Sequence, residues 1–175
     1  PVISAETRLL CGVEALVRWR HPVRGLIAPD QFIPLAESTG LIMPLGEWVL
    51  RQACADASLW PACVKVAVNI SAVQFRRGDL FDTIFHTLLE SGLAPGRLEL
   101  EITETAVLDN QEAHLATIRR LKNLGISMAL DDFGTGYSAV KYLRSFPFDK
   151  IKIDKSFTQG VLDRRDCQAV VASTL

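Results

Sequence analysis

The sequence predicts an α/β fold in which strands and helices alternate to form a (β/α) barrel. Three observations lead to this prediction. Segments with strand-like alternation are separated by segments with helical periodicity along most of the chain. Each strand-like segment has one apolar face and one face of small or polar residues. Polar residues suited to a catalytic site recur within the strand-like segments, one strand after another.

Five segments alternate clearly enough to be strands, and helical patterns fill the gaps between them. The predicted strands cover residues 13–19, 64–71, 98–103, 126–131 and 150–154. The predicted helices cover residues 29–38, 45–59, 79–90, 110–124 and 138–144, and a last one begins near residue 163. Asn110 is the predicted N-cap of the fourth helix, and Gly125 is its predicted stop.

The two faces of each strand distinguish a barrel from an open sheet. In the strand at 98–103, Leu98, Leu100 and Ile102 share one face, while Glu99 and Glu101 share the other. An open doubly wound sheet is covered by helices on both sides and needs two apolar faces. A barrel turns one face toward its interior and the other toward an outer ring of helices. We therefore expect the polar face to line a barrel interior.

One polar residue from each strand is expected at a shared active site. Barrel active sites form at the carboxyl ends of the strands. Glu14, Asn69, Glu101, Asp131 and Lys152 are spaced so that they would converge there, and the long first step leaves room for the extra helix at 29–38.

Asp131 and Asp132 are adjacent carboxylates at the end of an apolar strand, followed by a loop containing Gly134 and Gly136. Two neighbouring negative charges repel each other and gain little from ordinary packing. They are explained by one or two cations bound above the strand. The glycines indicate a backbone that bends tightly near a ligand.

Composition limits the classes of function. The chain has 175 residues, 49% of them hydrophobic, and a net charge of −1, which gives no indication of DNA, RNA or polybasic membrane binding. No apolar run approaches the ~20 residues that cross a bilayer. Four cysteines without CxxC spacing are expected to be reduced core thiols, as in a cytosolic protein. A complete (β/α)₈ barrel needs about 250 residues, so we expect a barrel truncated at both ends, with its last strands missing.

Five motifs, in order and at suitable spacing, resemble those of the EAL family of bacterial cyclic-di-GMP phosphodiesterases, whose fold is a TIM-like barrel. The matching segments are Glu14-Ala15-Leu16, Val68-Asn69-Ile70-Ser71, Glu101-Ile102-Thr103-Glu104, the stretch that starts with Asp131-Asp132-Phe133-Gly134, and Lys150-Ile151-Lys152-Ile153-Asp154. The resemblance covers essentially the whole chain and identifies residues 1–175 as a partial EAL domain.

The resemblance implies a two-ion site for Mg²⁺ or Mn²⁺, in which Asp131 bridges the two ions. It implies that Lys152 lies by the attacking water, that Arg18 contacts a substrate phosphate, and that Glu104 anchors the loop after Asp132. The implied reaction is hydrolysis of cyclic di-GMP to linear pGpG. The metal ligands implied in this way are Glu14, Asn69, Glu101, Asp131 and Asp132.

Departures from the family pattern leave a second reading open. A glutamate on the seventh strand and a glutamine on the eighth, both typical of the family, would lie beyond Leu175, and Ala139 replaces a common serine. We therefore expect the 175-residue chain alone to be inactive or weakly active, although its parent protein is active. The alternative is a catalytically incompetent module that binds cyclic di-GMP or a partner protein. Another divalent-metal barrel enzyme, such as an enolase-like lyase, is disfavoured by the motif context.

Individual residues also have ordinary structural readings. Glu14 would be a surface residue if its strand lay at a sheet edge, and Lys152 would be an ion-pair partner of a buried carboxylate. Glu99 belongs to no ligand motif and is expected to pair with Lys65 or Lys150 lower in the barrel. For Asp154, a substrate contact and a structural pairing both remain open.

The resemblance further implies partners and location. It implies a homodimer, and a parent protein in which this segment is fused to sensory or diguanylate-cyclase domains. The segment itself is expected in the cytoplasm without membrane contact, while other parts of the parent protein provide any anchor in the inner membrane.

Overall fold

The computed structural model of the chain describes residues 1–76, 79–104, 106, 111–134 and 146–174. Its centre is one curved six-stranded sheet with the order β1-β2-β5-β6-β7-β8, in which all neighbours are parallel except β1 and β2. The strands of this sheet are β1 (Val2–Ile3), β2 (Leu10–Ala15), β5 (Lys65–Asn69), β6 (Leu98–Thr103), β7 (Ser127–Phe133) and β8 (Lys150–Ile153).

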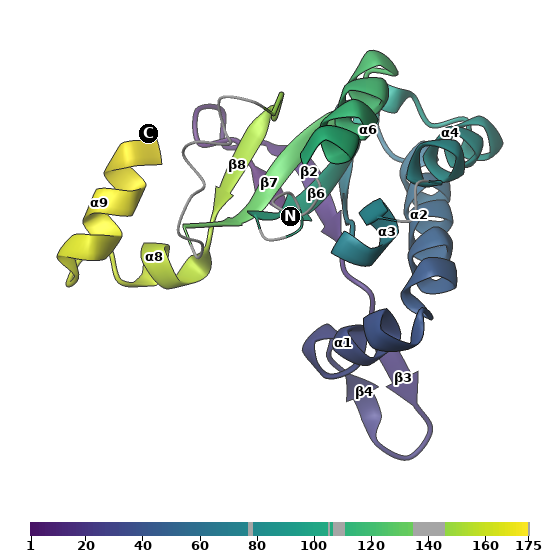
Figure 1. Ribbon diagram of the computed structural model, residues 1–175. Coiled ribbons are helices and arrows are strands. Elements are labelled where there is room, and N and C mark those ends of the chain that lie inside the picture. The colour runs from purple at the N-terminus through teal and green to yellow at the C-terminus, as the bar shows by residue number, and fades with distance from the viewer. Residues whose placement is uncertain (77–78, 105, 107–110, 135–145, 175) are drawn as a thin grey trace.

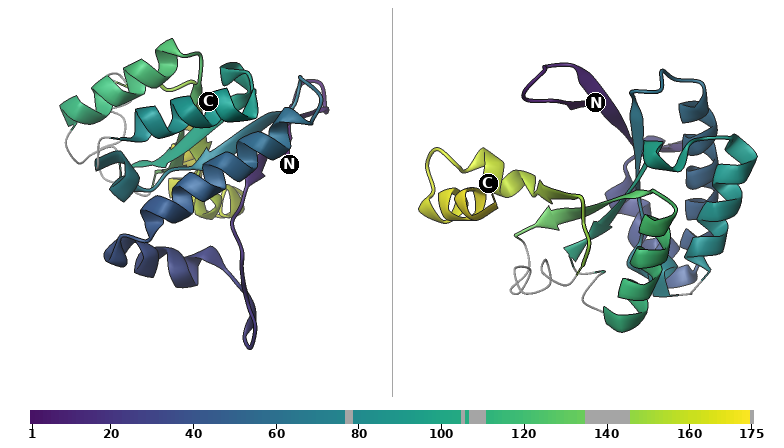
Figure 2. Two further views of the ribbon diagram at one scale, coloured as in Figure 1. Left: turned by 90° about the vertical axis from the view of Figure 1, so that its right-hand side faces the viewer. Right: turned by 90° about the horizontal axis from the view of Figure 1, so that it is seen from above.

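Helices cover one face of the sheet, as the ribbon views show (Figures 1 and 2). Helices α2, α4 and α6 pack beside one another there, and α2 and α6 contact strands β5 and β7. The helices of the described residues are α1 (Pro29–Thr39), α2 (Ile42–Ser58), α3 (Ala72–Arg76), α4 (Leu80–Ser91), α6 (Gln111–Asn123), α8 (Lys155–Gln159) and α9 (Arg165–Thr174), with a 3-10 turn η1 (Pro95–Arg97) before β6.

The opposite face of the sheet is concave and uncovered in the described part of the chain, where β1 and β8 form the two open edges. The sheet is thus part of a TIM-like barrel wall, which confirms the predicted truncated barrel.

The hydrophobic core lies between the sheet and the helices. Val66 and Val68 of β5 and Leu98 and Leu100 of β6 are essentially inaccessible to solvent. They pack against apolar helix residues such as Leu50 of α2 in one continuous cluster. Burial of each such side chain contributes roughly 1.5–3 kcal/mol. The predicted parity is therefore correct: the apolar face meets the helices, and the polar face lines the concave side.

The first predicted strand was placed wrongly at its end. It was expected at 13–19, but β2 ends at Ala15, and the alternating residues that follow enter a separate hairpin of β3 (Trp19–His21) and β4 (Gly25–Ile27). The ring Nδ1 of His21 accepts hydrogen bonds from two backbone amides in the turn, at 3.1 Å each. Gly25 has φ +72°, which favours glycine. This turn chemistry reverses the chain where alternation alone continues the strand.

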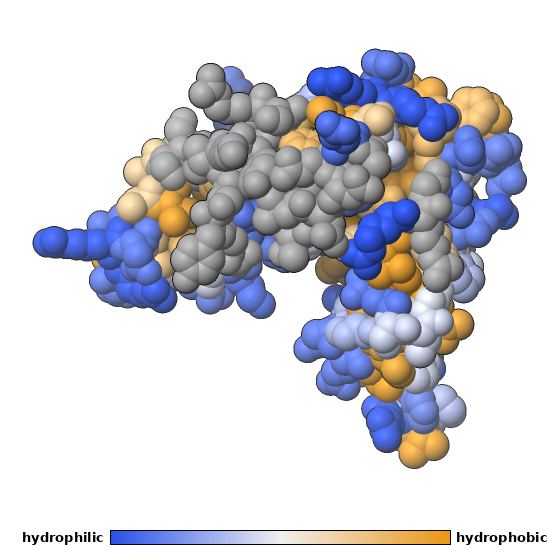
Figure 3. Space-filling view, viewed as in Figure 1, coloured by the Kyte–Doolittle hydropathy of each residue, from blue (hydrophilic) through white to orange (hydrophobic). Residues whose placement is uncertain are grey.

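The hairpin and α1 project away from the sheet (Figure 1). Apolar residues reach its tip, seen as the lowest atoms of Figure 3. Val23 is 88% exposed and Leu26 is 66% exposed.

Most predicted helices are present with shifted ends. The extra helix expected at 29–38 is α1, which ends at a left-handed Gly40. The helix expected at 45–59 begins earlier, at Ile42. The proposed cap Asn110 and the helix expected at 138–144 lie outside the described residues.

The cysteine prediction is correct for two of four residues. Cys54 and Cys167 are buried, and burial raises the pKa of the Cys54 thiol to about 11. Cys11 and Cys63 are exposed, because they lie at the amino-terminal ends of β2 and β5, outside the helix-covered core. All four are free thiols. Among the described helices, none is long and apolar enough to span a membrane.

Candidate metal centre

The concave face carries one predicted site residue from each of five parallel strands. Glu14 lies on β2, Asn69 on β5, Glu101 on β6, Asp131 on β7 and Lys152 on β8. Strand register brings them together, because Asn69 lies directly opposite Glu101. All five strands run parallel, so their carboxyl ends meet at one edge of the sheet.

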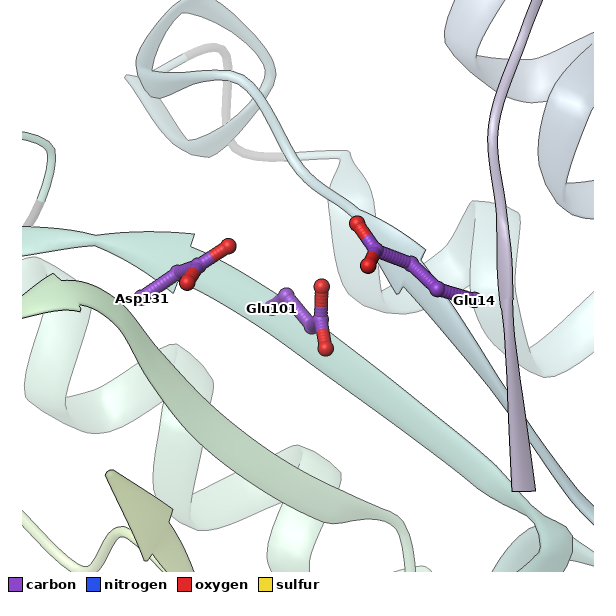
Figure 4. Close-up of side chains that lie close together, drawn as sticks. All are labelled: Glu14, Glu101 and Asp131. Carbon is purple, nitrogen blue, oxygen red and sulfur yellow. The ribbon is translucent and has the colours of Figure 1, made fainter. Parts of the chain in front are cut away.

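Three carboxylates form the centre of this group. Glu14, Glu101 and Asp131 each offer an oxygen atom, and these oxygens lie within 4.8 Å of one another. Figure 4 shows the three side chains pointing toward a common space. Asn69 adds a fourth oxygen-bearing side chain, and its Nδ2 donates a hydrogen bond of 2.8 Å to Oε1 of Glu14. The donor chemistry fits a hard divalent cation, which binds carboxylate and amide oxygens.

Lys152 lies among these carboxylates. Its Nζ is 2.6 Å from Oε2 of Glu101, 2.9 Å from Oδ2 of Asp131 and 3.6 Å from Oε2 of Glu14. The structural reading of Lys152 as an ion-pair partner of a buried carboxylate is therefore correct as geometry.

Burial and charge oppose each other at this centre. Desolvation, with a smaller contribution from the charges of Glu14 and Asp131, raises the pKa of Glu101 to about 7 against the lowering effect of Lys152. Desolvation alone would lower the pKa of Lys152, but its hydrogen bonds to Glu101 and Asp131 raise that pKa above its ordinary value. The ammonium is therefore charged at neutral pH, and the site has unbalanced negative charge that a metal ion would offset.

Asp132 lies beside the three-carboxylate cluster. It is exposed, its φ of +54° is in the left-handed region, and its amide donates a 2.9 Å hydrogen bond to Oδ1 of Asp131. A left-handed non-glycine residue is strained, and such strain is concentrated at functional sites. Desolvation, followed by the charges of Asp131 and Asp154, raises the pKa of Asp132.

The remaining predicted residues are less directly placed. Arg18 is exposed in the segment between β2 and β3, and its Nη1 donates to the carbonyl oxygen of Val17 at 2.9 Å. Glu104 is buried just after β6, but most of the loop it was expected to anchor lies at residues 135–145, outside the described residues.

Asp154 caps α8 by accepting a 2.9 Å hydrogen bond from the amide of Ser156, so its observed pairing is structural. Glu99 pairs with Lys150, as predicted, at 2.6 Å.

A polar network next to Asn69 was missed from the sequence. Oγ of Ser71 donates to Oε1 of Glu37 at 2.6 Å, and the amide of Ser71 donates to Oε1 of Gln74 at 3.1 Å. Gln74 is 4% exposed. These contacts hold the turn that follows Asn69. The signal available in the sequence was Ser71 itself, within the motif that contains Asn69.

An open cavity of about 420 Å³ lies beside this network, between α1, α2 and the ends of β2 and β5. Apolar residues such as Leu16 and Ile33 line most of it, together with Asn69 of the carboxylate site. Asn69 therefore belongs both to the candidate metal centre and to the lining of a cavity large enough for part of a ligand.

Fold and site together define a barrel-type domain with a cluster of carboxylates, suited to a cation, at the carboxyl ends of its strands. The EAL domain family model matches residues 1–175. The chain therefore belongs to the EAL family.

Relatives and solved structures agree with this assignment. An uncharacterized signaling protein of Caulobacter vibrioides is 50% identical over the whole chain, which covers 22% of that relative. The bifunctional diguanylate cyclase/cyclic di-GMP phosphodiesterase MucR of Pseudomonas aeruginosa is 42% identical over 99% of the chain and 26% of that protein. The solved structure of the MucR phosphodiesterase with c-di-GMP superposes with a TM-score of 0.93, covering 98% of this chain and 71% of that one. The chain thus spans about a quarter of the curated relatives it matches.

Proposed function

We propose that this domain hydrolyses cyclic di-GMP to linear pGpG in a reaction that depends on divalent metal ions. The observation that carries the proposal is the convergence of Glu14, Glu101 and Asp131 to within 4.8 Å at the carboxyl ends of three strands. The family match over the whole chain supports it, as do relatives named cyclic di-GMP phosphodiesterases, among them NbdA of Pseudomonas aeruginosa at 44% identity.

The residues present fit two Mg²⁺ or Mn²⁺ ions. Glu14, Asn69, Glu101 and Asp131 would hold the first ion, and Asp131 with Asp132 would hold the second. Every donor is a carboxylate or amide oxygen, which hard cations prefer. The four carboxylates carry four negative charges, which two divalent ions would balance. When bound, the ions would supply an activated water and offset the charge of the phosphodiester.

The chain's own cationic residues would position the substrate phosphate. Lys152 projects from β8 into the carboxylate group, so its ammonium would lie near the scissile phosphate and stabilise negative charge that develops there. Arg18 is exposed, and among the described residues no carboxylate forms an ion pair with it. Its guanidinium would therefore be available to bind a phosphate oxygen. Glu104 would anchor the loop that follows Asp132.

The protonation state of Glu101 and the orientation of Glu14 both affect metal binding. Glu101 is 2% exposed, and burial raises its pKa to about 7. It must be ionised to serve as a metal ligand, and a bound cation favours that form. Asn69 donates to Glu14 and so fixes the orientation of that carboxylate toward the common space.

The cellular setting is part of the proposal. Because the curated relatives are several times longer than this chain, and MucR carries a diguanylate cyclase activity in its name, we place the domain in a multidomain bacterial signalling protein. We further propose that it works as a homodimer in the cytoplasm.

The test is turnover of cyclic di-GMP by the protein in its full natural length, with Mg²⁺ or Mn²⁺, following pGpG by chromatography. Glu101→Gln removes a proposed ligand, while Glu99→Gln changes a buried glutamate on the same strand that pairs with Lys150 and is not a proposed ligand. Turnover that is lost in Glu101→Gln and kept in Glu99→Gln supports the proposal. Tight nucleotide binding without cleavage by the wild type would replace it with a receptor function.

A further inference from the structure

Lys152 differs from the neighbouring lysine on the same face of the same strand. Lys150 lies two residues earlier on β8 and contacts both oxygens of one carboxylate, Glu99, at 2.6 and 2.7 Å. Lys152 contacts three carboxylates from three different strands, Glu14, Glu101 and Asp131. Side-chain exposure is 28% for Lys152 and 41% for Lys150. Lys150 therefore forms a simple ion pair, while Lys152, nearer the carboxyl end of β8, is a cation surrounded by carboxylates.

The carboxylates around Lys152 are the ones that would bind a metal ion. Glu101 and Asp131 accept hydrogen bonds from Nζ at 2.6 and 2.9 Å. A divalent ion binds such oxygens at about 2.0–2.6 Å. An ammonium and a metal ion would thus use the same oxygens of the same side chains. Two cations at about 4 Å from each other repel by several kcal/mol even with the screening found near a protein surface.

We propose that the Lys152 ammonium is a built-in counter-cation of the carboxylate cluster, which the first divalent ion must displace in order to bind. The inference rests on the proposed function, because it assumes that the cluster is a metal centre. Displacement frees Lys152 from Glu101 and turns its ammonium outward, where it meets the substrate phosphate. The lysine therefore becomes available to substrate only after the metal ion has bound.

Two consequences separate this proposal from a purely structural salt bridge. Lys152 stabilises the metal-free protein, because three partly or fully buried carboxylates would otherwise repel one another without a nearby cation. It also weakens metal binding, because the ion has to replace an existing cation. Lys152→Met should therefore lower the melting temperature in chelator and raise the affinity for metal ion at the same time.

The test is Mn²⁺ binding by isothermal titration calorimetry, without nucleotide, on the protein in its full natural length. We expect Lys152→Met to bind Mn²⁺ at least about tenfold more tightly than the wild type. Lys150→Met removes the ammonium that pairs with Glu99, and its affinity for Mn²⁺ should stay within about threefold of the wild type. Lys152→Arg keeps the positive charge and should also stay near the wild type.

Equal or weaker Mn²⁺ binding by Lys152→Met would overturn the proposed displacement, because the lysine would then order the carboxylate ligands and not compete with the ion. If Lys152→Met does not fold, Lys152→Gln gives the same comparison. Absence of Mn²⁺ binding by both the wild type and Lys152→Met would overturn the proposed function together with this inference. Wild-type binding without a gain in the neutral variants would overturn the inference alone.

Discussion

The ion pair between Lys150 and Glu99 gives a prediction about stability that is separate from activity. The Glu99 side chain is 6% exposed, and both of its oxygens accept hydrogen bonds from Nζ of Lys150 at 2.6 and 2.7 Å. Removing one partner of a buried pair costs about 3–5 kcal/mol, because the other charge stays buried. Since 41% of the Lys150 side chain is exposed, water partly replaces it, and we expect about 2 kcal/mol for Lys150→Met.

A double-mutant cycle isolates the interaction. Glu99→Gln leaves a half-exposed lysine without its partner and should cost about 1 kcal/mol, the scale of one hydrogen bond. The double variant has no buried charge and should cost less than the sum of the single variants by about 1–2 kcal/mol. Urea denaturation at 25 °C measures all four proteins. A cost below about 0.5 kcal/mol for Lys150→Met would contradict this prediction, because Glu99 would then be solvated or paired elsewhere.

Three further changes test other parts of the fold. Burial would raise the pKa of Asp149, but hydrogen bonds from Lys122 and a backbone amide hold it below its ordinary value. Because its folded-state pKa is lowered, Asp149 stabilises the protein at neutral pH, and this contribution disappears as pH falls below about 4. Asp149→Asn should therefore cost about 1 kcal/mol at pH 7 and flatten the acid limb of stability measured by urea denaturation. Gly46→Ala would place a Cβ 2.1 Å from Nε2 of buried Gln74, so we expect a loss of about 1 kcal/mol despite the higher helix propensity of alanine, measured in the same way. Arg97 donates to two carbonyl oxygens near the end of α2 and the start of β5, at 2.7–3.1 Å. Arg97→Ala should lower stability by about 2 kcal/mol in thermal unfolding, and an unchanged melting temperature would show that water satisfies those carbonyls.

The sequence determined the faces of the strands more reliably than their ends. Alternation placed Leu98 and Leu100 toward the helices and Glu101 toward the concave side, because a one-residue slip would expose the whole apolar face. The end of β2 was missed, because alternation continues through Trp19 while a turn beginning at His21 pairs that segment with β4. Alternation of apolar and polar residues shows the two faces of a strand, but it does not identify the strand with which it pairs.

The site was predictable in membership but not in its contacts. Parallel strands place Glu14, Glu101 and Asp131 at one end of the sheet, and the structure brings their oxygens within 4.8 Å. The sequence could not decide which carboxylates surround Lys152, because that depends on strand tilt and stagger. It also gave no reason to connect Glu37 with Ser71, since they lie on different elements and meet only through the packing of α1.

Anomalous diffraction from crystals of the protein in its full natural length would locate bound Mn²⁺ and so test the proposed metal centre directly. We predict a peak about 2.0–2.3 Å from oxygens of Glu14, Glu101 and Asp131, with Asn69 as a further ligand and Lys152 displaced from Glu101. Peaks found only outside this group of residues and Asp132, or no peak at a Mn²⁺ concentration that supports turnover, would contradict the proposed metal centre.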